Sequence, residues 1–374
     1  MIKDLFSQEL NAPLTLTPRQ EDQIFDLLHA HDFVPLFLYH LPPGELESRF
    51  SEDFCLKIRN QAKQEAILDL ESTVCIKYVL QEFEKQHIDS ILLKGAALSH
   101  QIYPEAGLRP RSDADLLVPL NKFPDACTLL EQLGYSRTDP FAGDLVKVAR
   151  VYSKMGRFNL PHVVDLHSEI TSTHGPYREH MTYDRIKLTS ISLPGLAPNA
   201  HCMSKCHALL HASFHSAQHY SHFGESLIWL YDIHLLLENL SEDELTETIK
   251  LARLTKTSGL LAHGISRSHY WFLSEIPESI KSELINLEGD RSLEILEDNL
   301  ELGIANRAIS DIREISGVPN KIRYILQRLF PPINYMMETN NSKNLLRVPL
   351  LYVQRIINVV KLTWSKLKEI TRKV

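Results

Sequence analysis

The sequence has little of what marks fibrous, secreted or membrane-spanning proteins. Only 14 of its 374 residues are glycine and we find no internal repeat, which argues against a fibrous or low-complexity chain. No run approaches the roughly 18 apolar residues that a membrane-spanning helix needs. The first ten residues include Asp4 and Glu9 and lack an apolar signal core, so we expect no secretory signal.

Cysteine is also scarce. The five cysteines are odd in number, and their spacing matches neither a zinc ribbon nor a redox pair. They are Cys55, Cys75, Cys127, Cys202 and Cys206. We therefore expect free thiols in a reducing compartment, with the cytoplasm as the default location.

Charge is distributed unevenly along the chain. The net charge is −7, but residues 343–374 contain eight Lys or Arg and one Glu, so the other 342 residues carry 32 positive and 46 negative side chains. An acidic body is a poor general binder of nucleic acid, because non-specific affinity depends on neutralising phosphates. The basic segment mixes its cations with Leu, Val, Ile and Trp364, which predicts an amphipathic helix. Such a helix can contact an anionic membrane surface as a peripheral element, dock on the acidic body, or stay solvated.

Two apolar runs, 91–93 and 114–118, predict strands joined by a helix over about 96–103. Successive side chains of a strand point to opposite faces, so Asp113 and Asp115 should project from the same face. Two neighbouring carboxylates repel each other unless a cation lies between them. Hard oxygen ligands favour Mg²⁺, so we predict a magnesium site here.

Gly95 stands at the predicted turn from strand to helix. A missing side chain there lets the backbone approach a ligand closely. The unpaired N–H groups of the helix that follows attract an anion, and phosphate is the obvious one. We therefore predict a phosphate-binding turn beside the two aspartates.

A third aspartate lies in the second of two predicted strands, 146–152 and 157–167. Asp165 falls in an apolar run and should share a face with His167. A lone carboxylate is costly to bury unless it is paired or bound to a metal. Two interpretations stay open, a metal ligand and an ion pair with a nearby arginine.

Four histidines recur every four residues in the predicted helix beyond Pro198. They are His207, His211, His215 and His219. Four-residue steps spread them over about 120° of the helix surface, so adjacent pairs but not all four can hold one metal ion. Two cysteines at the same spacing keep zinc in consideration. A substrate-pocket role and plain packing are the other interpretations.

Other local signals predict helix boundaries and one buried ion pair. Thr17 before Pro18 and the Ser241–Glu244 pair are typical N-terminal caps. Gly134 is a typical C-terminal residue after a helix over 123–133. Asp232 lies in a nearly all-apolar helix and needs a partner.

The pattern LLKGAAL, then a tyrosine, then GLRPRSDADLLV, resembles a poorly characterised bacterial nucleotidyltransferase-like family. That family carries LKG, an arginine, an Asp-x-Asp strand and a later Asp-x-His strand. The wider fold is that of DNA polymerase beta. The resemblance implies an α+β fold, with a small mixed nucleotidyltransferase sheet flanked by N-terminal helices and followed by a C-terminal helical domain. We expect an N-terminal helical segment at 1–88, the core at 89–195, a helical domain at 196–340 and the basic helix at 341–374.

The resemblance also implies an activity and a set of site residues. It implies metal-dependent transfer of a nucleoside monophosphate from a nucleoside triphosphate, ATP first, to an acceptor that the pattern does not identify. Asp113, Asp115 and Asp165 would be catalytic and would hold Mg²⁺ or Mn²⁺. Nucleotide binding would involve Lys94, Gly95, Ala96, Arg109, Arg111 and Ser112, and His167, His211 and His215 would line the substrate pocket.

One residue departs from the wider pattern. Members often have serine after the glycine of the turn, whereas this chain has Ala96, which removes one hydroxyl contact to phosphate. An alternative is a catalytically inactive module that binds nucleotide or a protein partner, but the presence of all three carboxylates argues against it. A peripheral membrane scaffold is a third hypothesis, and it explains only the basic end.

Overall fold

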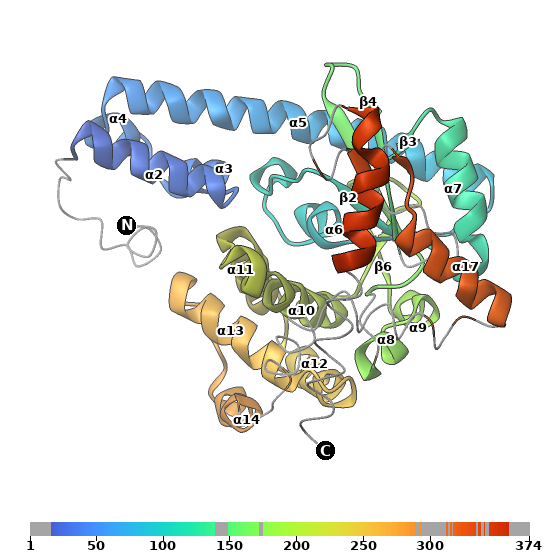
Figure 1. The fold of residues 1–374 in the computed structure, drawn as a ribbon. Helices are drawn as coiled ribbons and strands as arrows, with labels where there is room; N and C mark the ends of the chain where they lie inside the picture. Colours follow the sequence, from blue (N-terminus) through green and yellow to red (C-terminus); the bar gives the residue numbers. More distant parts are fainter. Residues whose placement is uncertain are drawn as a thin grey trace.

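The computed structural model describes residues 16–138, 149–171, 175–288, 317–333 and 344–358, together with residues 292, 312, 315, 336, 337 and 340. Figure 1 shows α10 to α14 gathered on one side of the molecule and the long helix α5 on the other, with the strands between them. The predicted α+β architecture is confirmed.

From residue 16 onward, four described helices precede the sheet. They are α2 (Pro18–Ala30), α3 (Val34–His40), α4 (Glu45–Arg49) and α5 (Glu52–Lys85). The predicted cap of α2 is confirmed, because the Thr17 side chain accepts from the Gln20 N–H and Gln20 Oε1 accepts from the Thr17 N–H at 2.9 Å. The 34-residue α5 packs against α2, α3 and α4 and is long enough to reach the sheet at its end.

The sheet has seven strands in the order β3-β4-β5-β2-β1-β7-β6. Their bounds are β1 Ile91–Leu93, β2 Ala114–Leu117, β3 Ser136–Arg137, β4 Ala149–Met155, β5 Pro161–His167, β6 Ile191–Ser192 and β7 His201–Cys202. Strand β2 is antiparallel to β1 and parallel to β5. This pairing puts Asp115 opposite Asp165. A strand was predicted over 146–152, and β4 runs from 149 to 155. Residues 146–148 lie outside the described residues.

Short helices connect the strands. They are α6 (Lys94–Gln101), η1 (Ala106–Leu108), η2 (Leu120–Lys122), α7 (Phe123–Gln132), α8 (Pro176–His180) and α9 (Tyr183–Leu188). Gly134 follows α7 with a φ of 86°, in the left-handed region that favours glycine, as predicted. Helix α6 begins two residues earlier than expected, so Lys94 and not Ala96 opens it.

The helical domain contains α10 (Lys205–Phe223), α11 (Leu227–Asn239), α12 (Glu242–Leu254), α13 (Ser258–Phe272) and α14 (Glu278–Glu288). The predicted capping box of Ser241 and Glu244 is confirmed. Phe33, the residue directly before α3, packs against Tyr231 and Phe272 at ring separations of 5.7 Å. The N-terminal helices and the helical domain therefore share one hydrophobic core.

A second core lies on the other face of the sheet. Alternate strand residues, including Leu92, Leu116 and Val164, pack there against the end of α5 and against α7. Asp115 and Asp165 point to the opposite face, as the two-residue period of strands predicts.

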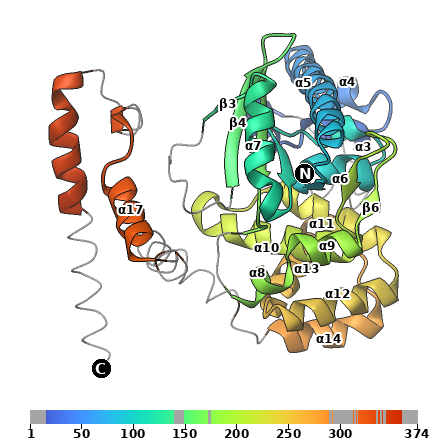
Figure 2. The same ribbon diagram turned by 90° about the vertical axis from the view of Figure 1, so that its right-hand side faces the viewer.

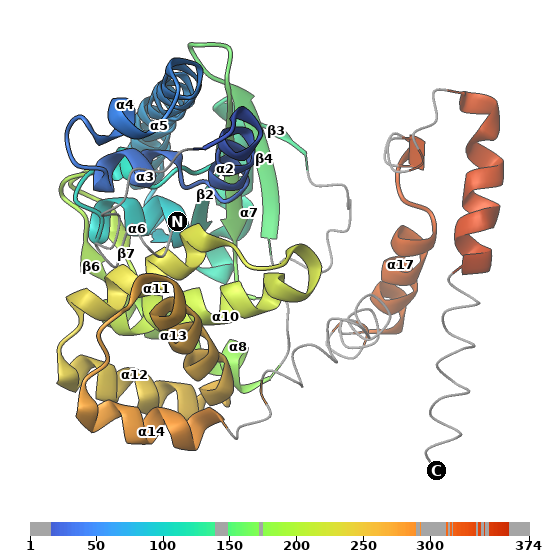
Figure 3. The ribbon, with the colours of Figure 1, turned by 90° about the vertical axis from the view of Figure 1, so that its left-hand side faces the viewer.

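The described part of the C-terminal region contains α17 (Val318–Leu329) and a helix over 348–358, with η3 (Leu345–Arg347) directly before the second helix. Arg355 Nε donates to the Arg328 carbonyl at 3.0 Å, and Tyr352 contacts Phe330 and the Pro331 carbonyl. Figures 2 and 3 show the pair side by side and apart from the rest of the molecule. The remainder of the predicted basic helix, 359–374, lies outside the described residues. Within the described part of the chain, no helix combines the length and apolarity that crossing a bilayer requires.

Candidate functional site

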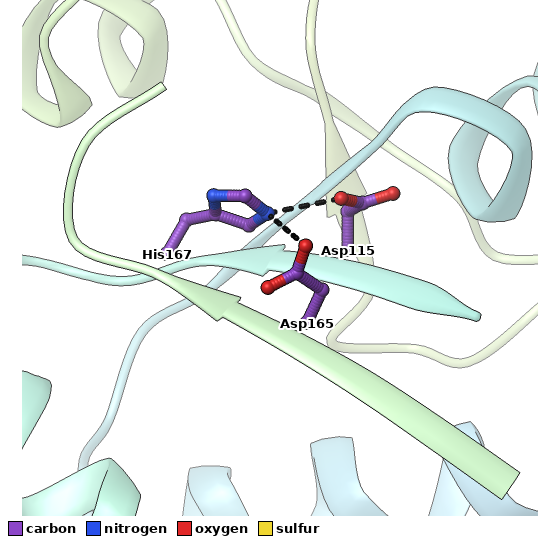
Figure 4. A group of neighbouring side chains, drawn as sticks. All are labelled: Asp115, Asp165 and His167. Carbon is purple, nitrogen blue, oxygen red and sulfur yellow. Dashed lines mark hydrogen bonds and ion pairs between the residues drawn. The ribbon is translucent and has the colours of Figure 1, made fainter. Parts of the chain in front are cut away.

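Asp115, Asp165 and His167 form a compact cluster on the neighbouring strands β2 and β5. His167 Nε2 lies 2.9 Å from Asp115 Oδ1 and 3.2 Å from Asp165 Oδ2. Figure 4 shows the imidazole pointing at both carboxylates. One ligand atom from each residue lies within 4.8 Å of the other two, close enough to share a metal ion. Asp165 is thus paired with a histidine. One of the two interpretations of the sequence had predicted an ion pair with an arginine instead.

Lys94 brings a second cation to the cluster. Its Nζ lies 2.6 Å from Asp115 Oδ1. The backbone of Lys94 has a φ of 48°, a left-handed conformation that costs a non-glycine residue on the order of 1 kcal/mol. The turn from β1 into α6 is therefore made by Lys94 and not by Gly95, and it aims the ammonium group at the carboxylates.

These contacts set the charge states of the cluster. Burial would raise the pKa of Asp115, but the charges of Lys94 and His167 beside it hold that pKa well below its usual range. Burial likewise opposes the charged form of His167, and its hydrogen bonds to Asp115 and Asp165 outweigh this and raise its pKa to about 9. Asp115 is therefore an anion held between two cations.

Asp113 lies just before β2 and is half-buried at the edge of the same pocket. Burial, and then the negative charge of Asp115, raise the pKa of Asp113 to about 6, against the opposing charge of Lys94. Asp113 is not one of the three residues whose ligand atoms already lie within metal-sharing distance. The sequence pattern predicted the same role, metal binding, for Asp113 and Asp115. In the structure, the two side chains differ in burial, in pKa and in their distance from the other ligand atoms.

The cluster of Asp115, Asp165 and His167 also contains a buried oxygen atom that a divalent cation could bind. Asp165 Oδ1 is buried, and no described residue gives it a hydrogen bond. A buried carboxylate oxygen without a partner is costly, and a hard cation is one ligand that would satisfy it. Two carboxylates and one imidazole are an ordinary ligand set for a divalent metal.

Arg109 is part of a buried ion pair. Its Nε and Nη2 each lie 2.9 Å from an Asp232 carboxylate oxygen, and the Tyr103 hydroxyl donates to Asp232 Oδ1 at 2.7 Å. The partner that Asp232 was predicted to need is therefore Arg109. A Cβ added at Gly95 would lie 3.3 Å from Arg109 Cζ, a tight contact, so the guanidinium packed against this position favours glycine there.

The other predicted nucleotide-binding residues also differ in their surroundings. Arg111 Nη1 lies 2.7 Å from Asp69 Oδ1, so this guanidinium is held by α5. The Ala96 side chain is buried in the core on the far face of the sheet. Ser112 is exposed and lines the pocket.

The cluster opens into a pocket of about 390 Å³. The carboxylates and Lys94 line one part of its wall, and His211, His215 and His219 of α10 line another, next to Trp229. The rings of His215 and Trp229 are 4.7 Å apart. His211 and His215, which were predicted to line a substrate pocket, thus lie in the wall of this pocket, whereas His207 contacts Ser204 and Thr189.

Some residues of the pocket wall carry no recognisable sequence signal. Gln101 and Met203 line the pocket, and Tyr177 supports His211 from behind through a 2.8 Å hydrogen bond. Gln101 ends α6 and Met203 precedes α10, so they meet only through tertiary packing.

Three comparisons relate the chain to known proteins. No curated protein matches the chain. A solved structure, an antigenic nucleotidyltransferase-like protein from Paracoccidioides brasiliensis, is similar at 13% identity and a TM-score of 0.35, over 56% of this chain and 95% of that one. The model of a family described as uncharacterised nucleotidyltransferase matches residues 17–273. The chain therefore belongs to this nucleotidyltransferase family.

Proposed function

We propose that this protein transfers a nucleoside monophosphate from a nucleoside triphosphate, with ATP as the first candidate, to an acceptor in a metal-dependent reaction. The observation that carries the proposal is the register of two parallel strands, which puts Asp115 beside Asp165 in a pocket that also contains Lys94. Adjacent carboxylates and an ammonium group are suited to a triphosphate and its metal ions.

Each residue has a distinct part in this proposal. Asp115 and Asp165, with Asp113 at the pocket edge, would hold Mg²⁺ or Mn²⁺, which supplies charge neutralisation for the triphosphate when bound. Lys94 would exchange its contact with Asp115 for a phosphate oxygen. The first backbone N–H groups of α6 would donate to the same phosphates.

Arg109 and Arg111 act less directly in this proposal. Both guanidiniums line the pocket, and both are already paired with buried carboxylates. They fix the segment 109–113 between α5, α6 and α11, which positions Asp113 and Ser112. Arg109 and Arg111 were predicted to bind the nucleotide. In this proposal, Lys94 is the main residue that neutralises the charge of the triphosphate.

One observation supports a second candidate, a nucleotide-binding module without catalysis. Lys94 and His167 neutralise Asp115 without any metal ion, so the cluster is stable as a set of ion pairs. A module of this kind would bind nucleotide but transfer nothing. The five free cysteines lead us to propose the cytoplasm as the location of either candidate.

Labelled nucleotides distinguish the two candidates. The purified protein is incubated with each α-labelled nucleoside triphosphate, Mg²⁺ or Mn²⁺, and a cell extract as the source of acceptor. Transfer predicts label on protein, RNA or a small molecule, lost when the metal is chelated or the protein omitted. Nucleotide binding without label transfer for any of the four nucleotides would favour the inactive module.

A further inference from the structure

The pocket continues well beyond the carboxylate cluster, along the whole of α6. Lys94 opens that helix and Gln101 is its last residue, and both line the pocket. At 1.5 Å of rise per residue, the two positions are about 10 Å apart along the helix axis. The far end is bounded by apolar side chains and by α10, through Leu98, Met203 and Ala208.

Gln101 presents an unused acceptor at this far end. Its Nε2 donates to the Met203 carbonyl at 2.9 Å, which fixes the orientation of the amide. The other amide atom, Oε1, is buried, and no described residue donates to it. A buried acceptor without a donor costs free energy, so its presence in a pocket wall points to a ligand that supplies an N–H.

His211 presents an unused ring nitrogen in the same pocket. The residue is 4% exposed, and its Nε2 is buried with no hydrogen-bond partner among the described residues. Its Nδ1 lies 2.8 Å from the hydroxyl of Tyr177, a residue that is itself buried and stacked on Phe214 at 4.1 Å. The ring is thus held from behind, with its free nitrogen on the side away from Tyr177.

The Tyr177 contact also determines which nitrogen carries the proton. Burial, followed by the positive charge of Lys94, lowers the pKa of His211 to about 3, so the ring is neutral. The buried Tyr177 O–H needs an acceptor, and Nδ1 is the atom in reach. Tyr177 therefore donates to Nδ1, and the proton of His211 lies on Nε2 as a donor.

We propose that the part of the pocket between the carboxylate cluster and Gln101 binds the nucleobase of the nucleotide, with Gln101 Oε1 accepting from a base N–H at the far end and His211 Nε2, on the facing helix α10, donating to a base nitrogen or carbonyl. The Watson–Crick edge of every nucleobase presents donors and acceptors side by side, and the flat apolar face of the base suits a wall of Leu98, Met203 and Ala208. The separation of about 10 Å between Lys94 and Gln101 along α6 leaves room for the ribose and phosphates. This inference rests on the proposed function.

Binding measurements test the base site separately from the phosphate site. Calorimetry with Ca²⁺ present measures the Kd of ATP, GTP, CTP, UTP and inorganic tripolyphosphate for the parent and for His211→Ala and Gln101→Met. Each variant should bind the preferred nucleotide about tenfold more weakly, the effect of losing one hydrogen bond, and tripolyphosphate as the parent does. His207→Ala, one turn earlier on α10, should bind both ligands like the parent.

Tyr177→Phe supplies a second, milder variant. It keeps the ring that stacks on Phe214 but removes the hydroxyl that holds the His211 proton, so nucleotide affinity should fall by less than in His211→Ala while tripolyphosphate binding stays constant. Thermal unfolding of every variant checks that it folds.

The outcomes separate this inference from the proposed function. A parent that binds nucleotides no more tightly than tripolyphosphate, or folded variants that bind nucleotides like the parent, would overturn the base site and leave the transferase proposal standing. An equal loss for nucleotide and tripolyphosphate would also overturn it, because it would place His211 and Gln101 at the phosphates. A parent that binds neither ligand would overturn both.

Discussion

Strand β5 presents one histidine to each face of the sheet, and the two histidines differ in charge. His167 contacts Asp115 and Asp165, and these contacts raise its pKa to about 9 in spite of burial. His162 is paired through Nδ1 with the Tyr135 hydroxyl at 2.7 Å, and burial lowers its pKa to about 4. At neutral pH the first is protonated and the second is not.

Depth of burial does not explain this difference, since His162 is 3% exposed and His167 is 8% exposed. The neighbours explain it. His167 contacts two carboxylates that line one pocket, whereas His162 contacts the uncharged Tyr135 hydroxyl beside another cavity, on the face that packs against the apolar core of α5 and α7. Opposite pKa shifts on one strand therefore distinguish the face that is the candidate for chemistry from the face that packs on the core.

The largest expected effect comes from removing the central anion of the pocket face. Asp115→Asn should lower metal-dependent label transfer by at least about 100-fold, because it removes a charged metal ligand without changing side-chain size. It should also lower the melting temperature, since Lys94 and His167 lose their shared carboxylate. Asp125→Asn, on the exposed side of α7, is the matched control and should change neither. Parent-level transfer by Asp115→Asn would contradict the transferase proposal.

The second prediction concerns Asp165 and separates a metal ligand from a structural ion pair. Asp165→Asn should weaken Mn²⁺ binding about tenfold or more and reduce label transfer in parallel, because its unpartnered Oδ1 is the oxygen best placed for a cation. Electron paramagnetic resonance of free Mn²⁺ measures the binding. Unchanged Mn²⁺ affinity together with a lower melting temperature would assign Asp165 to the fold alone.

Local sequence patterns were sufficient to predict which side chains share a face of the sheet and where two of the helices begin. The alternation around Asp115 and the Asp165-x-His167 pair correctly predicted which side chains share a face, because the period of a strand is a local property. The helix caps at Thr17 and Ser241 were predicted for the same reason.

Contacts between distant segments could not be predicted in this way. Arg109 and Arg111 were expected to face phosphate, but their carboxylate partners come from helices far away in the sequence. Gly95 was predicted to let the backbone approach a bound phosphate, whereas in the structure the Arg109 side chain is packed against it. Charge pairs of this kind depend on tertiary packing, and one sequence carries no signal for which acid meets which base.

A third prediction uses pH to test the core face. The folded-state pKa of His162, about 4, is below its unfolded value of about 6.5, so the unfolded chain binds more protons between these limits. Stability should therefore fall as the pH drops through this window, by about 2 kcal/mol at pH 5 from this residue. Urea unfolding at pH 7 and pH 5 should show a smaller drop for His162→Asn than for the parent. Equal drops would indicate that His162 is already protonated in the fold.

The C-terminal helices offer a contrast to both faces of the sheet, because many of their apolar side chains are exposed. Leu346 is 89% exposed, and Leu350, Val353 and Ile357 continue its stripe along the helix over 348–358. From residue 317 onward the chain has eleven Lys or Arg and two Glu, whereas residues 1–316 are strongly acidic. An apolar stripe with cations beside it fits an anionic lipid surface, and we propose peripheral contact of that kind.

Deleting residues 343–374 should abolish sedimentation with anionic vesicles and leave label transfer unchanged, because the carboxylate cluster lies far upstream. Each Lys or Arg near such a surface contributes about 1 kcal/mol, so the binding by the parent should weaken steeply once salt shortens the screening length below about 8 Å. Arg347→Gln with Arg355→Gln should weaken it partly, and vesicles of neutral lipid should bind little. If the segment instead docks on the acidic body, the deletion will lower the melting temperature, and the parent will not sediment at either low or high salt.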